Sequence, residues 1–170
     1  SAAGEKGAEN AVYTELLART GTGSVYAYSP DTQTTRCLAN RLQGAGGLAL
    51  NETQDALYVS ETNAGRIWRL ALNAQQADLS AAAGGSVPAG VSLVAQGLSG
   101  YPAGLACGTD GTIWVSQCGA RSRWAENAPA LLRRAVLHLP RRTRAFLLRP
   151  KADSGAALGF TADGNQSGAA

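Results

Sequence analysis

The chain has 170 residues, of which 45% are hydrophobic and 16% charged, and this size and composition predict one folded domain rather than a disordered segment. Its formal net charge is only +3, and no apolar run approaches the roughly 20 residues that a membrane-spanning helix needs. The basic residues gather in one segment and leave the rest of the chain net acidic, so we expect no nucleic-acid partner.

The first two thirds of the chain predict short strands. In residues 13–43, the alternating segments 23–28 and 37–43 predict two strands that form the back half of a four-stranded unit. Residues 44–99 contain four such segments and predict one complete unit. Within it, residues 74–90 are rich in Ala, Gly and Ser, which predicts a flexible surface loop between the outer strands.

The last third combines strands with a helical insert. Residues 100–118 predict the front half of a third unit, and residues 150–164 predict the next strands. Between them, residues 128–149 interleave leucines and arginines, which predicts a short helix that is broken at Pro140.

Two phrases of the sequence recur at nearly the same offset. Gly-Leu-Ala occupies residues 47–49 and 104–106, and an aromatic residue followed by Val-Ser occupies residues 58–60 and 114–116. A β-sandwich also has evenly spaced strands, but it does not require them to resemble each other, whereas the blades of a β-propeller do. We therefore expect an all-β fold, a β-propeller of which roughly two and a half blades are present, with one helical insert. Glycines on the inner strands are expected where neighbouring backbones converge on a central channel.

Cysteines and asparagines add little. Cys37, Cys107 and Cys118 lack the spacing and the histidine partners of a zinc site, so we expect free thiols, with one disulfide as the alternative. Asn51 and Asn165 begin Asn-x-Ser/Thr phrases and are candidate glycosylation sites in a secretory compartment.

Three longer phrases resemble a known family. They are Leu-Tyr-Val-Ser-Glu-Thr-Asn-x-x-Arg-Ile at 57–67, Leu-Ser-Gly-Tyr-Pro at 98–102 and Asp-Gly-Thr-Ile-Trp-Val at 110–115. Their order and spacing resemble the strictosidine synthase-like family, in particular its adipocyte plasma membrane-associated branch, with paraoxonases and gluconolactonases as distant relatives. The resemblance implies a six-bladed β-propeller, with the remaining blades supplied by a longer chain.

The same resemblance implies an activity for the full-length protein. It is hydrolysis of the arylesterase or lactonase type, or the condensation of an amine with an aldehyde as in strictosidine synthases, each on a small-molecule substrate. The glutamate of the synthases would lie beyond Ala170, so no catalytic residue is assigned. The alternative is a non-catalytic propeller that serves as an interaction or structural module. The resemblance also implies a secretory, endomembrane or membrane-associated location.

Distant relatives hold calcium at the top of the channel through carboxylate and amide oxygens, of which calcium needs six to eight. By the resemblance, the ligand positions correspond to Gly46, Ala103 and Gly104, and none of these has a side-chain oxygen. We therefore expect no metal and no other cofactor to be bound by this segment.

Five positions remain as candidate pocket residues: Gly46, Glu61, Tyr101, Ala103 and Gly104.

For the polar and aromatic candidates, a structural role competes with a functional one. Glu61 could be a pocket acid with a raised pKa, but we favour a carboxylate that binds backbone at a blade turn or pairs with Arg66. Tyr101 and Trp114 could line a pocket, but we favour a place in the core between blades. His138 lies among leucines with no nucleophile phrase nearby, and we expect a structural role.

The basic insert also has two interpretations. Residues 131–151 contain seven basic residues and no acidic one. The segment could lie on an anionic membrane surface, or it could be a helical cap whose leucines pack on the blades, and we favour the cap because Pro140 shortens any amphipathic face. The basic residues are Arg133, Arg134, Arg141, Arg142, Arg144, Arg149 and Lys151.

Overall fold

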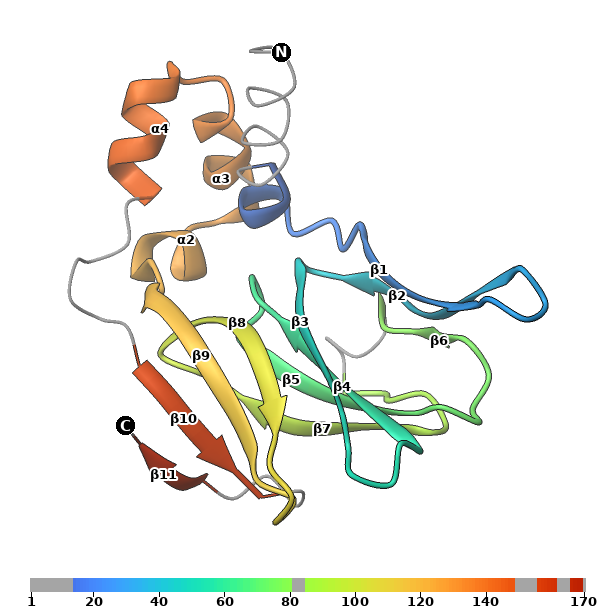
Figure 1. The fold of residues 1–170 in the computed structure, drawn as a ribbon. Coiled ribbons are helices and arrows are strands. Elements are labelled where there is room, and N and C mark those ends of the chain that lie inside the picture. Colours follow the sequence, from blue (N-terminus) through green and yellow to red (C-terminus); the bar gives the residue numbers. More distant parts are fainter. Residues whose placement is uncertain (1–13, 81–84, 149–155, 162–165, 170) are drawn as a thin grey trace.

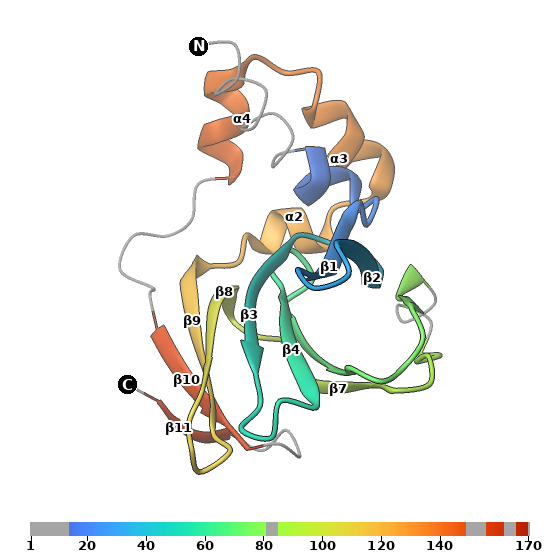
Figure 2. The same cartoon turned by 45° about the vertical axis from the view of Figure 1, so that its right-hand side comes forward.

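The computed structural model describes residues 14–80, 85–148, 156–161 and 166–169. Three β-sheets stand side by side, and a group of short helices lies at one end of them (Figure 1). Turned by 45°, the same view shows the sheets fanning out from the strands nearest the centre (Figure 2). This arrangement confirms the expected all-β, propeller-type fold.

The second sheet is a complete four-stranded blade. Its strands are β3 (Ala45–Leu50), β4 (Ala56–Glu61), β5 (Arg66–Ala71) and β7 (Val91–Gln96), hydrogen-bonded in that order and all antiparallel. A chain that meanders outward in this way and then crosses to the next sheet is the repeating unit of a propeller.

The third sheet follows the same order across a long interruption. It pairs β8 (Gly100–Cys107), β9 (Ile113–Ala120), β10 (Ala156–Phe160) and β11 (Gln166–Ala169). Because β10 pairs with β9, the helical insert is a connection within one blade and does not separate two blades.

The first sheet contains β1 (Gly23–Ser29) and β2 (Thr34–Leu42), which pair antiparallel. A third strand, β6 (Ala77–Asp78), lies parallel to β2, although it comes from the connection between β5 and β7 of the second sheet.

The strand β6 corrects the expectation of a flexible loop over residues 74–90. Ala77 and Leu79 are buried against the first sheet, and the Asp78 carboxylate accepts a hydrogen bond from the Ser80 N–H at 2.9 Å. The two apolar side chains are too isolated in the sequence to show a strand period, but burying them ties the connection to the outer edge of the neighbouring blade.

Three helices lie in the described part of the connection between β9 and β10: α2 (Arg123–Asn127), α3 (Ala130–Val136) and α4 (Arg141–Leu148). α3 and α4 are separated at Pro140, as expected, while α2 was not anticipated. Its N-cap is Ser122, whose side chain accepts a hydrogen bond from the Ala125 N–H. Among the described residues, no helix is long and apolar enough to cross a bilayer.

Apolar side chains form separate cores at the two junctions between sheets. Trp68 is 1% exposed and lies in the core between the first and second sheets, whereas its strand neighbour Ile67 is fully buried in the core between the second and third. This alternation explains why β4 and β5, in the middle of a blade, are apolar on both faces. The thiols of Cys37, Cys107 and Cys118 are free.

Candidate functional site

The inner strands β3 and β8 lie against each other where the two blades approach the central axis. A Cβ atom added at Gly47 would lie only 2.2 Å from the Ala103 carbonyl oxygen and 2.7 Å from the Leu105 nitrogen. Both neighbours are backbone atoms, so no side chain fits at position 47 unless the strands move apart. The recurring glycine therefore sets the distance between adjacent blades.

Two hydroxyl groups at the C-terminal end of β4 close this junction. The Ser60 Oγ, fully buried, accepts a hydrogen bond from the Gly47 N–H at 2.6 Å and donates one to the Ala103 carbonyl at 2.8 Å. The Thr62 Oγ1 donates to the Pro102 carbonyl at 2.7 Å. These hydroxyls hold the second and third blades together and have no hydrogen left for a ligand.

The three axial positions do not fit a calcium site. Gly46, Ala103 and Gly104 offer only backbone carbonyls, and the Ala103 carbonyl already accepts a bond from Ser60. A Cβ at Gly46 would lie 2.5 Å from the Thr62 Oγ1, so a ligating side chain has no room to begin there. In the part of the chain that the structure describes, no three His, Cys, Asp or Glu side chains come together. Calcium prefers several carboxylate oxygens, and this donor set cannot provide them.

Glu61 lies at the end of β4 and is 2% exposed. Its Oε1 accepts a hydrogen bond from the backbone N–H of Gln43 at 2.8 Å, and its Oε2 accepts one from Trp68 Nε1 at 2.8 Å. Arg66 Nε lies 3.0 Å from the same Oε2, and Arg66 Cζ lies over the Trp68 ring, 5.4 Å from the ring centroid. A buried carboxylate with this many donors acts as a structural anchor, which is the role that the sequence favoured.

The third sheet repeats this arrangement. Gln117, 4% exposed, occupies the position equivalent to Glu61, and its Oε1 accepts a hydrogen bond from the Gly100 N–H at 2.6 Å. Ser116, equivalent to Ser60, accepts one from the Gly104 N–H at 2.9 Å. The repeat in the sequence is therefore a repeat of one hydrogen-bonded junction.

The two copies differ in charge, and the partner strand explains the difference. Arg66 lies opposite Glu61 on β5, whereas Ala156 lies opposite Gln117 on β10. A carboxylate without its arginine would be a buried unpaired charge, and the amide avoids that cost. Among the described residues, Gln117 Nε2 has no hydrogen-bond partner.

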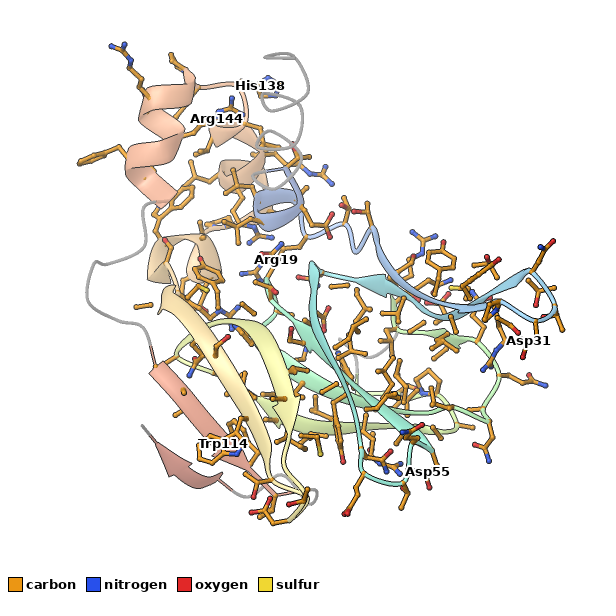
Figure 3. The ribbon with its side chains drawn as sticks, viewed as in Figure 1. Arg19, Asp31, Asp55, Trp114, His138 and Arg144 are labelled. Atoms are coloured by element: carbon orange, nitrogen blue, oxygen red, sulfur yellow. The ribbon has the colours of Figure 1, made fainter. Side chains whose placement is uncertain are left out.

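The remaining candidates do not lie around one pocket. The Tyr101 hydroxyl accepts a bond from the Ser122 N–H at 3.3 Å at the base of the insert. Trp114 is 42% exposed and alternates with the buried Ile113 and Val115, so it faces away from the second sheet. Its equivalent in the second sheet, Tyr58, is buried against the following sheet, so a place for Trp114 in the core between blades stays a prediction. Figure 3 shows His138 among the helices and Trp114 near the opposite end of the third sheet.

The candidate glycosylation site Asn51 is separate from the junction. The Asn51 side chain bridges the turn between β3 and β4, where its Nδ2 donates to Asp55 Oδ1 at 2.7 Å and its Oδ1 accepts from the Ala56 N–H at 2.9 Å. Asn165 lies outside the described residues. Glycosylation stays a prediction at both.

A cavity of about 290 Å³ opens beside the Glu61–Arg66 pair. Sequence reasoning missed it because its walls come from four separate segments without a motif. Burial, then repulsion from Arg133 and Arg121, lowers the pKa of Arg19 on its wall. The lining residues are Arg19, Thr20, Gly21, Arg41, Gln43, Glu61, Arg66, Asp78, Leu79 and Ser80.

Comparison with solved structures agrees with the propeller-type arrangement. The calcium-binding protein regucalcin from Agrobacterium tumefaciens aligns with a TM-score of 0.53 and 17% identity over 89% of this chain and 37% of that chain. A luciferin-regenerating enzyme aligns with a TM-score of 0.53 and 13% identity over 88% of this chain and 36% of that chain. This chain thus spans little more than a third of either structure, and at these identities the likeness shows the fold alone.

Comparison of sequences places the chain among the gluconolactonase relatives of the expected resemblance. No curated protein matches it. Residues 3–142 match the SMP-30/Gluconolactonase/LRE-like region. The match covers most of the chain, whereas the strictosidine synthase-like branch stays a prediction. The chain belongs to the SMP-30/Gluconolactonase/LRE-like family.

Proposed function

We propose that this chain forms part of a hydrolase of the lactonase or esterase type, which acts on a small molecule at the axial end of the propeller. The observation that carries the proposal is the family match over residues 3–142, together with the contact between the inner strands β3 and β8 of adjacent blades. Fold alone does not establish an activity, so the proposal depends on the family.

In this proposal the chain supplies a wall of the channel. Ser60, Thr62 and Glu61 are each engaged in the blade junction, and Gly46 and Ala103 present only backbone. The reacting groups of the complete protein therefore come from outside the junction.

An assay of the complete protein tests the proposal. Aryl esters and five- and six-membered lactones would be supplied with calcium and, separately, with a chelator. Turnover that disappears with the chelator would mean that other segments supply the metal ligands. Turnover that persists with the chelator would mean that hydrolysis proceeds without calcium. No turnover of any ester or lactone would refute the hydrolase.

The second candidate is a non-catalytic propeller that serves as an interaction or structural module. The observation that favours it is the loss of ligating oxygens at Gly46, Ala103 and Gly104. It predicts no turnover and no calcium binding by titration calorimetry of the complete protein. A more specific form of the enzymatic proposal is amine–aldehyde condensation of the strictosidine synthase type. An assay of the complete protein with a primary amine and an aldehyde would test it.

A further inference from the structure

The helices of the insert expose large apolar side chains. Leu131 on α3 is 82% exposed and Phe146 on α4 is 79% exposed, and Leu132, Leu139 and Leu147 are also exposed. These side chains do not pack on the blades that the structure describes, and the expected cap over the blades stays a prediction. Single exposed leucines are normal, but five large apolar side chains exposed within residues 131–147 make the insert a candidate interaction site.

The insert is nevertheless held firmly on its other side. Val136 is 5% exposed and packs with Leu17 and Ala125 in a core of its own. Arg133 Nε donates to the Leu17 carbonyl at 3.1 Å, and the same guanidinium also binds the Ala128 carbonyl. One side of α3 is therefore committed to residues 14–18 and α2, whereas Leu131 on the same helix is exposed.

Exposed arginines lie next to the exposed apolar side chains. Arg134 follows Leu131 by three residues on α3, and Arg142 precedes Phe146 by four on α4, so each pair shares a helix face. Both arginines are exposed. The sequence from residue 128 to residue 148 contains no carboxylate to neutralise them. The exposed sides of α3 and α4, together called the insert face, are thus each apolar and cationic.

We propose that this face of α3 and α4 binds the surface of an anionic lipid bilayer. Leu131 and Phe146 would enter the boundary between headgroups and acyl chains, while Arg134 and Arg142 would contact lipid phosphates. Charge complementarity favours this occupant over a second copy of the chain, because two copies of a face without carboxylates would repel each other.

The position of the insert gives the binding an orientation. α2 follows directly after β9, whose last residue Ala120 pairs with Gly100 at the start of the inner strand β8. The helices therefore stand at the end of the sheets where β8 begins (Figure 2). A bilayer bound to them would face that end of the channel. This proposal does not depend on the hydrolase activity proposed above.

Co-sedimentation of the complete chain with vesicles tests the proposal. The vesicles would contain phosphatidylcholine alone or phosphatidylcholine with phosphatidylserine. We expect binding to the phosphatidylserine vesicles only, weakened by salt. Removing both charges in the double variant R134Q/R142Q should weaken binding about 25-fold, at about fivefold per arginine. The matched variant R134K/R142K keeps the charges and should bind like the unchanged chain.

Removing the apolar side chains provides a second measurement. L131S/F146S should weaken vesicle binding at least about tenfold. The control Y26S/Y28S removes two side chains that are each 62% exposed on the first sheet and should not affect binding. All the substituted positions are exposed, and circular dichroism would check that each variant is folded.

Three results would overturn the proposal. In the first, the chain binds both kinds of vesicle equally or binds neither. In the second, R134Q/R142Q binds phosphatidylserine vesicles as well as the unchanged chain does. In the third, the chain self-associates without binding vesicles, and L131S/F146S makes it monomeric. The last result would assign the face to an interface between copies.

Discussion

Replacing Glu61 by alanine should destabilise the protein more than any other single change at the blade junction. The substitution removes the acceptor of the Gln43 N–H and of Trp68 Nε1, and it leaves Arg66 without its carboxylate. Glu61 is 2% exposed, so water cannot easily replace the lost oxygens.

The contacts give the size of the effect. Breaking a buried ion pair by removing one partner costs about 3–5 kcal/mol. The Arg66 side chain is 15% exposed and keeps some hydration, so we expect the lower end, a loss of about 3 kcal/mol in the free energy of unfolding. For a chain of this length that corresponds to a fall of about 6–12 °C in Tm.

Glutamine at position 61 should be tolerated better than alanine, and Gln117 shows why. An amide in the equivalent position keeps the bond to the backbone N–H of the preceding connection. E61Q should therefore cost about 1–3 kcal/mol, mainly through the unpaired Arg66. Adding R66A reproduces the Gln117–Ala156 pair of the third sheet, so the double variant should recover part of that loss.

Urea unfolding of the single and double variants, followed by tryptophan fluorescence, would measure these differences. The interaction energy between positions 61 and 66 should be about 1–3 kcal/mol. A loss below about 0.5 kcal/mol for E61A would refute the structural role, because substitutions without such contacts usually stay within that range. The structural role would also be refuted if E61Q kept the stability of the complete protein and abolished its turnover, because that result would identify Glu61 as a catalytic acid.

Three further predictions concern single positions. Gly47→Ala should cost about 1–3 kcal/mol in urea unfolding because its Cβ meets backbone of the next blade, and a loss below about 0.5 kcal/mol would contradict this account. Arg121→Lys should cost about 1–2 kcal/mol and speed amide exchange in the turn after β4, because lysine lacks the planar fork of donors with which Arg121 binds two carbonyls at 3.0 and 3.1 Å. Unchanged exchange would count against this role. Hydrogen bonds from the N–H and hydroxyl of Thr112 hold the pKa of Asp110 below its ordinary value of 3.8. The stabilisation by these bonds is therefore present above pH 3.8 and is lost as the pH falls through the lowered pKa. Asp110→Asn should make the free energy of unfolding less dependent on pH in this acid range, and an unchanged pH profile would refute this.

The parts of the fold that recur in the sequence could be predicted from it. Each blade needs a small residue where its inner strand meets the next blade, and two adjacent polar residues at the end of its second strand. Selection for the same junction therefore repeats the same short sequences. Gly47 and Gly104 therefore indicated the inner strands, and Ser60 and Ser116 now account for the recurring serine. Such a repeat predicts the strand order because each copy has to make the same bonds.

The parts without a second copy could not be predicted in this way. The strand β6 depends on Ala77 and Leu79 finding a hydrophobic edge on another blade, and no local period encodes that contact. The register on β9 that turns Trp114 away from the second sheet has no local signal either. Register is set by the partner strand, and a single segment does not reveal it.

The repeat also separates structural residues from candidates for function. A side chain that makes the same bond in two blades, as Glu61 and Gln117 do with the preceding connection, is explained by assembly of the propeller. Function has to be sought among the residues that break the repeat. These are the insert between β9 and β10 and the arginines around the cavity beside Glu61, which the third blade does not reproduce. The exposed Leu131 and Phe146 lie in the first of these, and this is why the lipid-binding face is the sharpest test that the chain itself offers.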